Sequence, residues 1–229
     1  KTVGDILTAN ALRSPKTRQK QPVFYQKLRQ EIPNGLVSID GSEIKIHIDD
    51  QIIKLNLEMA VDTNSFAHTA FSISVHETSE EFIKVLKEHI RQWGTPIGLV
   101  CDSGSANLSD ASMNFLDLHD IKPVPAGPAN PKGNGTIEGA FSQLKKVMGS
   151  IHIDSSSPEA LAKSVLQMIV SIYIKMRNKS PLIRQAKNPA ECMTIPVSDK
   201  HRLDVKQKLQ NQIDKKNWQN EDQPKLDLL

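Results

Sequence analysis

The sequence predicts an α/β protein with a mixed sheet, in which three antiparallel strands come first, parallel strands follow, and helices flank the sheet. Two observations predict this class. Residues 36–75 hold three segments that alternate apolar and polar residues, separated by short turn sequences. A segment of helical periodicity then leads to a short apolar run, which reads as a buried strand reached by a crossover.

The three alternating segments cover residues 36–48, 52–61 and 67–75. The pair Asp49 and Asp50 separates the first two segments, so we expect them to form a long hairpin. Residues 62–65 read Asp-Thr-Asn-Ser, which is typical of a turn into the third strand.

Helices are expected in four further segments. Residues 79–93 carry apolar residues at helical spacing, with Ser79 as the N-cap: Phe82, Ile83, Leu86 and Ile90. Residues 109–119 and a segment from Glu138 to about 150 follow the same pattern, and residues 122–131 between them read as a Pro-rich loop. Residues 158–177 predict a fourth helix with one apolar face: Leu161, Val165, Ile169 and Ile172.

Composition and charge limit the possible classes of protein. The chain of 229 residues has 38% apolar residues but no apolar run near the ~18 residues of a membrane span, so we expect no membrane partner. Cys101 and Cys192 show no metal-binding spacing, which favours a reduced, intracellular protein without disulfides.

The net charge of +3 is unevenly distributed along the chain. The net charge is +6 over residues 1–30, −7 over residues 31–152 and +4 over residues 153–229. The basic first segment includes Lys16, Arg18 and Lys20. It is either a solvated arm or an arm that binds nucleic-acid phosphates, and both readings stay open.

Two acidic residues stand in informative contexts, with 35 residues between them. Asp102 ends the apolar run of residues 96–101, and Glu138 follows a Pro/Gly loop that runs into a helix. Carboxylates at a strand end and in a helix's first turn are usually turn formers or caps. They are also suitable ligands for the divalent metals that phosphoryl transfer uses.

The surrounding residues resemble the catalytic core of retroviral integrases and DDE transposases. In that family an acid follows a strand as D-x-G-x, which is similar to Asp102-Ser103-Gly104-Ser105. Another acid ends the pattern N-P-x-x-x-G-x-[IV]-E, which residues 130–138 match. Residues 177–181, with 188–191 after them, are similar to the family's closing stretch, so the resemblance covers roughly residues 36–189.

The resemblance implies an RNase H-like fold and a third carboxylate on the first strand. Asp40 is the preferred candidate, because residues 40–45 are similar to the D-[GE]-T-x-[IV]-K opening of many transposases. Asp49 and then Asp62 are the alternatives. Asp49 would suit a shorter first hairpin, and Asp62 stands where family members often carry an acid that is not catalytic.

The resemblance also implies the cofactor and the contacts with DNA. Two Mg²⁺ or Mn²⁺ ions would be held by three carboxylates, with Asp40 bridging both ions and Asp102 and Glu138 each binding one. Asn134 falls where the family places a loop residue that touches DNA. Lys145, two helical turns beyond Glu138, and its neighbour Lys146 are either an exposed helix flank or contacts with end phosphates.

These implications predict a polynucleotidyl transferase of mobile DNA, whose partners are element ends, target DNA and at least one further copy of the chain. An RNase H-like nuclease without strand transfer and an inactive DNA-binding or assembly subunit are the alternatives. A zinc-binding His/Cys module is not found, which favours a bacterial-type transposase, acting in the cytoplasm at the nucleoid. The expected organisation is a basic arm (1–35), a catalytic core (36–190) and a polar C-terminal helix or tail (191–229).

Overall fold

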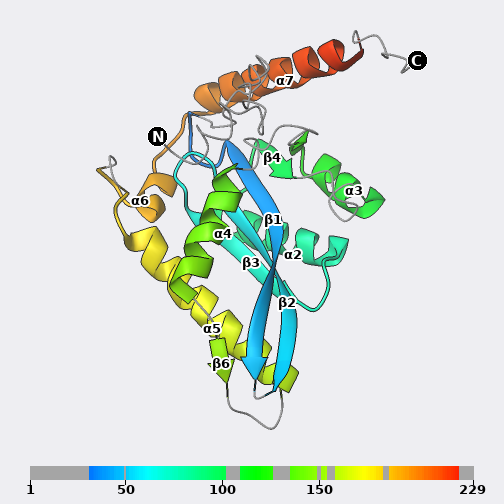
Figure 1. The fold of residues 1–229 in the computed structure, drawn as a ribbon. Coiled ribbons are helices and arrows are strands. Elements are labelled where there is room, and N and C mark those ends of the chain that lie inside the picture. The colour runs from blue at the N-terminus through cyan, green and yellow to red at the C-terminus, as the bar shows by residue number, and fades with distance from the viewer. Residues whose placement is uncertain are drawn as a thin grey trace, which may run out of the picture.

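The computed structural model describes residues 31–48, 50–101, 109–125, 135–148, 151–153, 158–182 and 186–221. These residues form a six-stranded mixed sheet with helices on both faces (Figure 1). The predicted α/β class is therefore confirmed. None of the helices in these ranges is both long and apolar enough to cross a membrane.

The sheet has the order β3-β2-β1-β4-β5, and β6 pairs with the far end of β1. The first three strands are antiparallel, and β4, β5 and β6 run parallel to their neighbours. The strand bounds are β1 Leu36–Ile48, β2 Gln51–Asp62, β3 His68–Ser74, β4 Gly98–Cys101, β5 Lys122–Pro125 and β6 Ile151–Ile153. The long hairpin and the third strand agree with the alternating segments of the sequence.

Six helices are described: α2 Ser79–Trp93, α3 Asp110–Leu118, α4 Gly135–Met148, α5 Pro158–Lys179, α6 Pro189–Met193 and α7 Asp199–Glu221. The four predicted helices are all present. The expected cap of α2 was wrong by one residue, because Thr78, not Ser79, is extended and accepts a hydrogen bond from the Glu81 N–H at 3.3 Å.

Strand β5 occupies part of the segment that was predicted to be a Pro-rich loop. Pro123 and Pro125 lie within it, and proline is tolerated there because β5 is an edge strand of the sheet. The predicted loop over residues 122–131 was therefore wrong for residues 122–125.

The buried face of α5 lies next to the predicted one. Ala162, Leu166, Val170 and Tyr173 are buried, whereas Ile172 is 51% exposed. Two adjacent rows of α5 are apolar, and periodicity alone does not tell which row faces the sheet.

The two faces of the sheet are covered by different helices. Ile44, Ile46 and Ile48 of β1 are buried in one cluster with α4 and α5. Val37 and Ile39 are buried in the other, with α2 and α3. Because successive side chains of a strand point to opposite faces, the even-numbered residues of this part of β1 face α4.

Helix α7 packs on the sheet through residues spaced four apart. Val205 and Leu209 are 1% exposed and share a cluster with Leu36, Val100 and Val124. The polar composition of the segment concealed this narrow apolar stripe.

A buried polar network joins the start of β1 to α2 and β3. The His89 ring is fully buried, with Nδ1 2.7 Å from Thr69 Oγ1 and Nε2 2.9 Å from Asn34 Oδ1. The amide nitrogen of Asn34 donates to the backbone oxygen of Trp93, so its Oδ1 is free to accept. A neutral His89 with its proton on Nε2 satisfies both contacts.

Asn178 of α5 closes part of the free edge of β3. Its Oδ1 accepts from the His68 N–H at 2.9 Å and its Nδ2 donates to the His68 carbonyl at 2.8 Å. One side chain thus substitutes for a neighbouring strand at this position.

Gly98 tests the packing of α7. A Cβ atom at this position would lie 2.7 Å from Leu209 Cδ2 and 3.0 Å from Leu36 Cδ1. We expect Gly98→Ala to lower the free energy of unfolding by about 1–3 kcal/mol through overpacking. Gly139→Ala is the matched control, because nothing lies within 4 Å of its added Cβ, and alanine in a helix should raise stability by about 0.5–1 kcal/mol. Equal effects of the two substitutions in urea unfolding would refute this packing.

The two buried histidines should make stability fall as the pH drops from about 6.5 to 4, against an opposite contribution from the buried Asp62, whose pKa is raised by burial. Burial lowers the pKa of His89 to about 4, and burial followed by repulsion from Arg177 lowers that of His68 to about 4. Since the unfolded chain binds these protons near pH 6.5, each histidine contributes a slope of up to about 1.4 kcal/mol per pH unit within this window. His89→Gln should reduce the slope of the unfolding free energy against pH by up to that amount. An unchanged slope would contradict the buried, neutral state of His89.

Candidate active site

A hollow of about 580 Å³ lies between β1 and α4. Four of the predicted site residues meet there: Asp40, Glu138, Lys145 and Lys146. The other residues that line it are Gly41, Ser42, Phe141 and Ser142.

Strand β1 carries Asp40 and Ser42 on the sheet face that α4 covers. They continue the row of Ile44, Ile46 and Ile48, which is buried against α4 and α5. The row thus changes from apolar to polar where the hollow begins. The Gly41 N–H donates to Asp40 Oδ1 at 2.9 Å.

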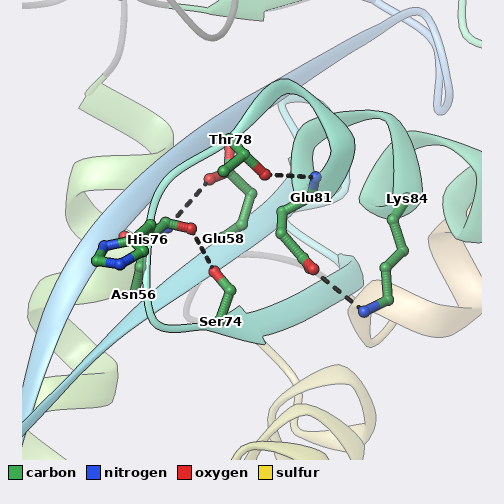
Figure 2. A network of polar contacts seen from close by, with 7 residues as sticks. All are labelled: Asn56, Glu58, Ser74, His76, Thr78, Glu81 and Lys84. Atoms are coloured by element: carbon green, nitrogen blue, oxygen red, sulfur yellow. Dashed lines mark hydrogen bonds and ion pairs between the residues drawn. The ribbon is translucent and has the colours of Figure 1, made fainter.

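Gly41 itself faces the opposite side of the sheet, towards a buried acid on β2. Glu58 is 1% exposed and pairs with Gly41 across the hairpin. A Cβ atom on Gly41 would lie 3.1 Å from Glu58 Oε2, so the glycine leaves room for this carboxylate. Figure 2 shows Glu58 with Asn56 beside the first turn of α2, and neither residue lines the hollow. Glu58 is therefore a buried acid of the hairpin and not a residue of the candidate site.

Helix α4 presents Glu138 to the hollow because its apolar side is fixed on the sheet. Ile137, Ala140, Phe141 and Leu144 are buried in the cluster formed with β1 and β2. Glu138, Ser142 and Lys145, at positions i, i+4 and i+7 of the helix, form the adjacent stripe. Arg177 Nε of α5 donates to Gln143 Oε1 at 3.2 Å and links the two helices.

Two lysines accompany the two carboxylates, so the charges that line the hollow balance. Lys145 Nζ donates to Ser42 Oγ at 2.7 Å and connects α4 to β1. Both lysine side chains are exposed, as is Glu138, and Asp40 is half-buried. The hollow therefore opens to solvent and can receive a charged ligand.

Asp62 occupies a different environment from Asp40. Its carboxylate is fully buried and accepts from the N–H groups of Asn34, Asn64 and Ser65 at 2.9, 3.2 and 2.7 Å, and from the Ser65 hydroxyl at 2.7 Å. Burial raises the pKa of Asp62, against the opposing effect of these hydrogen bonds. Asp62 holds the turn between β2 and β3, and it does not line the hollow.

The remaining predicted site residues lie outside the described residues: Asp102, Asp49, Asn134, Lys16, Arg18 and Lys20. Asp102 follows Cys101, the last residue of β4, in the sequence. β4 pairs in parallel with β1, and the last described pair joins Ser38 to Val100. Asp40 and Asp102 each come two residues after that pair along their own chain segments.

The oxygen donors of the hollow fit a hard divalent cation. Mg²⁺ and Mn²⁺ prefer carboxylate oxygens and water, and Asp40 and Glu138 offer carboxylates from two different elements. Within the described ranges no group of three or more His, Cys, Asp or Glu side chains could hold a metal ion. The structure thus provides two acids of the predicted three.

Ser42 is the site residue that the sequence analysis missed. A strand places residues two apart on the same face, so the assignment of Asp40 already put Ser42 beside it. Its contact with Lys145 spans 103 positions and has no local signal in the sequence.

Comparisons with known proteins identify the fold. No family model and no curated protein sequence matches the chain. The structure is similar to the HTLV-2 integrase catalytic core domain in complex with magnesium (dimeric form), with a TM-score of 0.56 and 21% identity over 72% of this chain and 99% of that one. It is also similar to a chain of the simian T-cell lymphotropic virus intasome in complex with the PP2A regulatory subunit B56 gamma (TM-score 0.57, 21% identity, 86% of this chain and 68% of that one).

A third similar structure is the catalytic core domain of BIV integrase, with a TM-score of 0.51 and 19% identity over 69% of this chain and 92% of that one. Three viral structures are thus similar to this chain, and at 19–21% sequence identity the similarity shows the fold alone. The chain therefore has a fold similar to that of these integrase catalytic core domains.

Proposed function

We propose that this chain is the catalytic core of a DDE-type transposase or integrase, which cleaves DNA at element ends and transfers the freed strand to target DNA. The observation that carries the proposal is the meeting of Asp40 and Glu138 in one open hollow of an integrase-like fold. The two residues belong to different elements and lie far apart in the sequence, and each stands in a sequence pattern that resembles the acid motifs of integrases and transposases.

Asp40, Asp102 and Glu138 are the proposed metal ligands. The parallel pairing of β1 with β4 supports Asp102 as the third acid, because its sequence position matches that of Asp40 beyond the last described pair. Two bound Mg²⁺ or Mn²⁺ ions supply activation of the attacking oxygen and stabilisation of the leaving one. Asp49 and Asp62 are the less favoured candidates for the acid on the first strand. The carboxylate of Asp62 is already satisfied by hydrogen bonds within the buried turn, so it needs no metal ion as a partner.

Lys145 and Lys146 are proposed to bind DNA phosphates beside the acids. An ammonium group gives a phosphate a point charge and up to three hydrogen-bond donors. Asn134 and the basic residues Lys16, Arg18 and Lys20 are proposed as further DNA contacts. Such phosphate contacts position the DNA strand rather than read its sequence.

The proposed reaction uses one set of residues for two steps. Water attacks the phosphodiester at the element end, and the freed 3′-hydroxyl then attacks a phosphodiester of target DNA. Both are in-line displacements at phosphorus, so only the nucleophile changes. Joining two ends requires two active sites, and we therefore propose at least a dimer on DNA. We further propose a bacterial-type element and an intracellular site of action at the nucleoid.

Metal binding gives the first test. Mn²⁺ at about ten times its Kd should raise the stability of the folded chain by about 1.4 kcal/mol, or the melting temperature by roughly 3–5 °C. Asp40→Asn, Asp102→Asn and Glu138→Gln should each remove most of this shift. Differential scanning fluorimetry with Mn²⁺ and Mg²⁺ measures it.

Asp62→Asn is the control for the metal test. It should lower the melting temperature without metal, since a buried hydrogen-bonded carboxylate is altered, but should keep the Mn²⁺-induced rise. A rise that persists in Asp40→Asn and Glu138→Gln would refute the assigned site. DNA binding without any response to metal would favour the inactive assembly subunit.

Strand transfer distinguishes a transposase from a nuclease. We expect the chain, given Mn²⁺ and a DNA duplex with a pre-cut 3′ end, to join that end to a supercoiled plasmid, and Glu138→Gln to abolish joining. Gel analysis of labelled products checks this. Metal-dependent nicking with no joined product, across a panel of candidate ends, would identify a nuclease instead.

A further inference from the structure

The contact between Lys145 and Ser42 joins the two walls of the hollow. Lys145 Nζ donates to Ser42 Oγ at 2.7 Å, across 103 positions of sequence. Lys145 comes from α4 and Ser42 from β1, the same two elements that carry Glu138 and Asp40.

The contact lies along the same rows as the two acids. Ser42 is two residues after Asp40, on the same face of β1. Lys145 is seven residues after Glu138, about two turns along the same side of α4. The ammonium group is therefore held at one end of the carboxylate pair, and all four residues line the hollow.

The hydrogen bond between Lys145 and Ser42 is better explained by a role in ligand binding than by a role in folding stability. Hydrogen bonds between exposed groups contribute little to folding, whereas a lysine side chain that is already placed loses less rotamer freedom when a ligand binds it. The hydroxyl of Ser42 accepts one of the three ammonium protons. The two remaining protons stay available for the oxygens of a phosphate.

Lys146 provides an internal comparison. It lines the same hollow and is equally exposed, but no hydrogen bond or ion pair holds its side chain within the part of the chain that the structure describes. The two adjacent lysines thus differ in whether their position is fixed before a ligand arrives.

We propose that Ser42 is a positioning residue, which orders the Lys145 ammonium to bind a DNA phosphate beside the carboxylates of Asp40 and Glu138. This proposal rests on the proposed function, because it takes DNA as the ligand of the hollow. Ser42 acts through Lys145, whose placement it fixes before DNA binds.

A double-mutant cycle on DNA affinity tests the proposal. The probe is a fluorescein-labelled DNA duplex, titrated by anisotropy with Ca²⁺ present, over a series of KCl concentrations. Ser42→Ala and Lys145→Ala should each weaken binding about 3–10-fold, and the double variant should be no weaker than Lys145→Ala alone. Ser42→Thr, which keeps the hydroxyl, should restore affinity.

The salt dependence separates positioning from general destabilisation. Lys145→Ala should reduce the slope of log K against log salt by about 0.9, the value for one lost phosphate contact, whereas Ser42→Ala keeps the charge and should change the slope less. Ser164→Ala is the control, because Ser164 is an exposed serine of α5 outside the hollow, and its hydroxyl donates to the carbonyl of Ala160. It should leave affinity unchanged.

Two results would overturn the proposal. Multiplicative losses in the double variant would show that Ser42 and Lys145 act independently, and unchanged affinity in Ser42→Ala would show that the contact has no role in binding. Either result, obtained while the parent chain still cleaves DNA with Mn²⁺, refutes the role of Ser42 and leaves the proposed function intact. A parent chain that neither responds to metal nor cleaves DNA refutes the proposed function itself.

Discussion

The packing of α4 on β1 is the constraint on which the candidate site depends. Ile137, Ala140, Phe141 and Leu144 form the buried side of the helix, in the cluster that includes the apolar row of β1. That packing fixes the rotation of α4 about its axis, so the stripe next to the buried side faces the hollow. Loss of this apolar contact would displace Glu138 from Asp40 even though neither acid takes part in the core.

The site and the supporting fold use polar residues in opposite ways. Asp62, His89 and Asn34 are buried and satisfied by several short hydrogen bonds, which is typical of polar groups that specify a fold. Asp40 and Glu138 instead reach a solvent-open hollow together with two lysines. The difference in environment separates a structural aspartate from a candidate ligand within one hairpin.

Local patterns in the sequence were sufficient for most of the fold. Alternation over residues 36–75 predicted the three antiparallel strands, and helical periodicity predicted α2 to α5. The errors arose where tertiary context decides: a proline-containing edge strand, the choice between two apolar rows of α5, and the narrow stripe of α7. The candidate site also divides into a local and a tertiary part. The motif around Asp40 predicted that residue, whereas the contact of Ser42 depends on α4, which is distant in the sequence.

The position of bound metal tests the central claim most directly. Anomalous diffraction at the manganese edge, from crystals of this chain grown with Mn²⁺, locates the ion without reference to activity. The account predicts density between β1 and α4, within ligand distance of the carboxylates of Asp40 and Glu138, with Asp102 completing the set. Manganese bound elsewhere, or a hollow without manganese at saturating concentration, would contradict it.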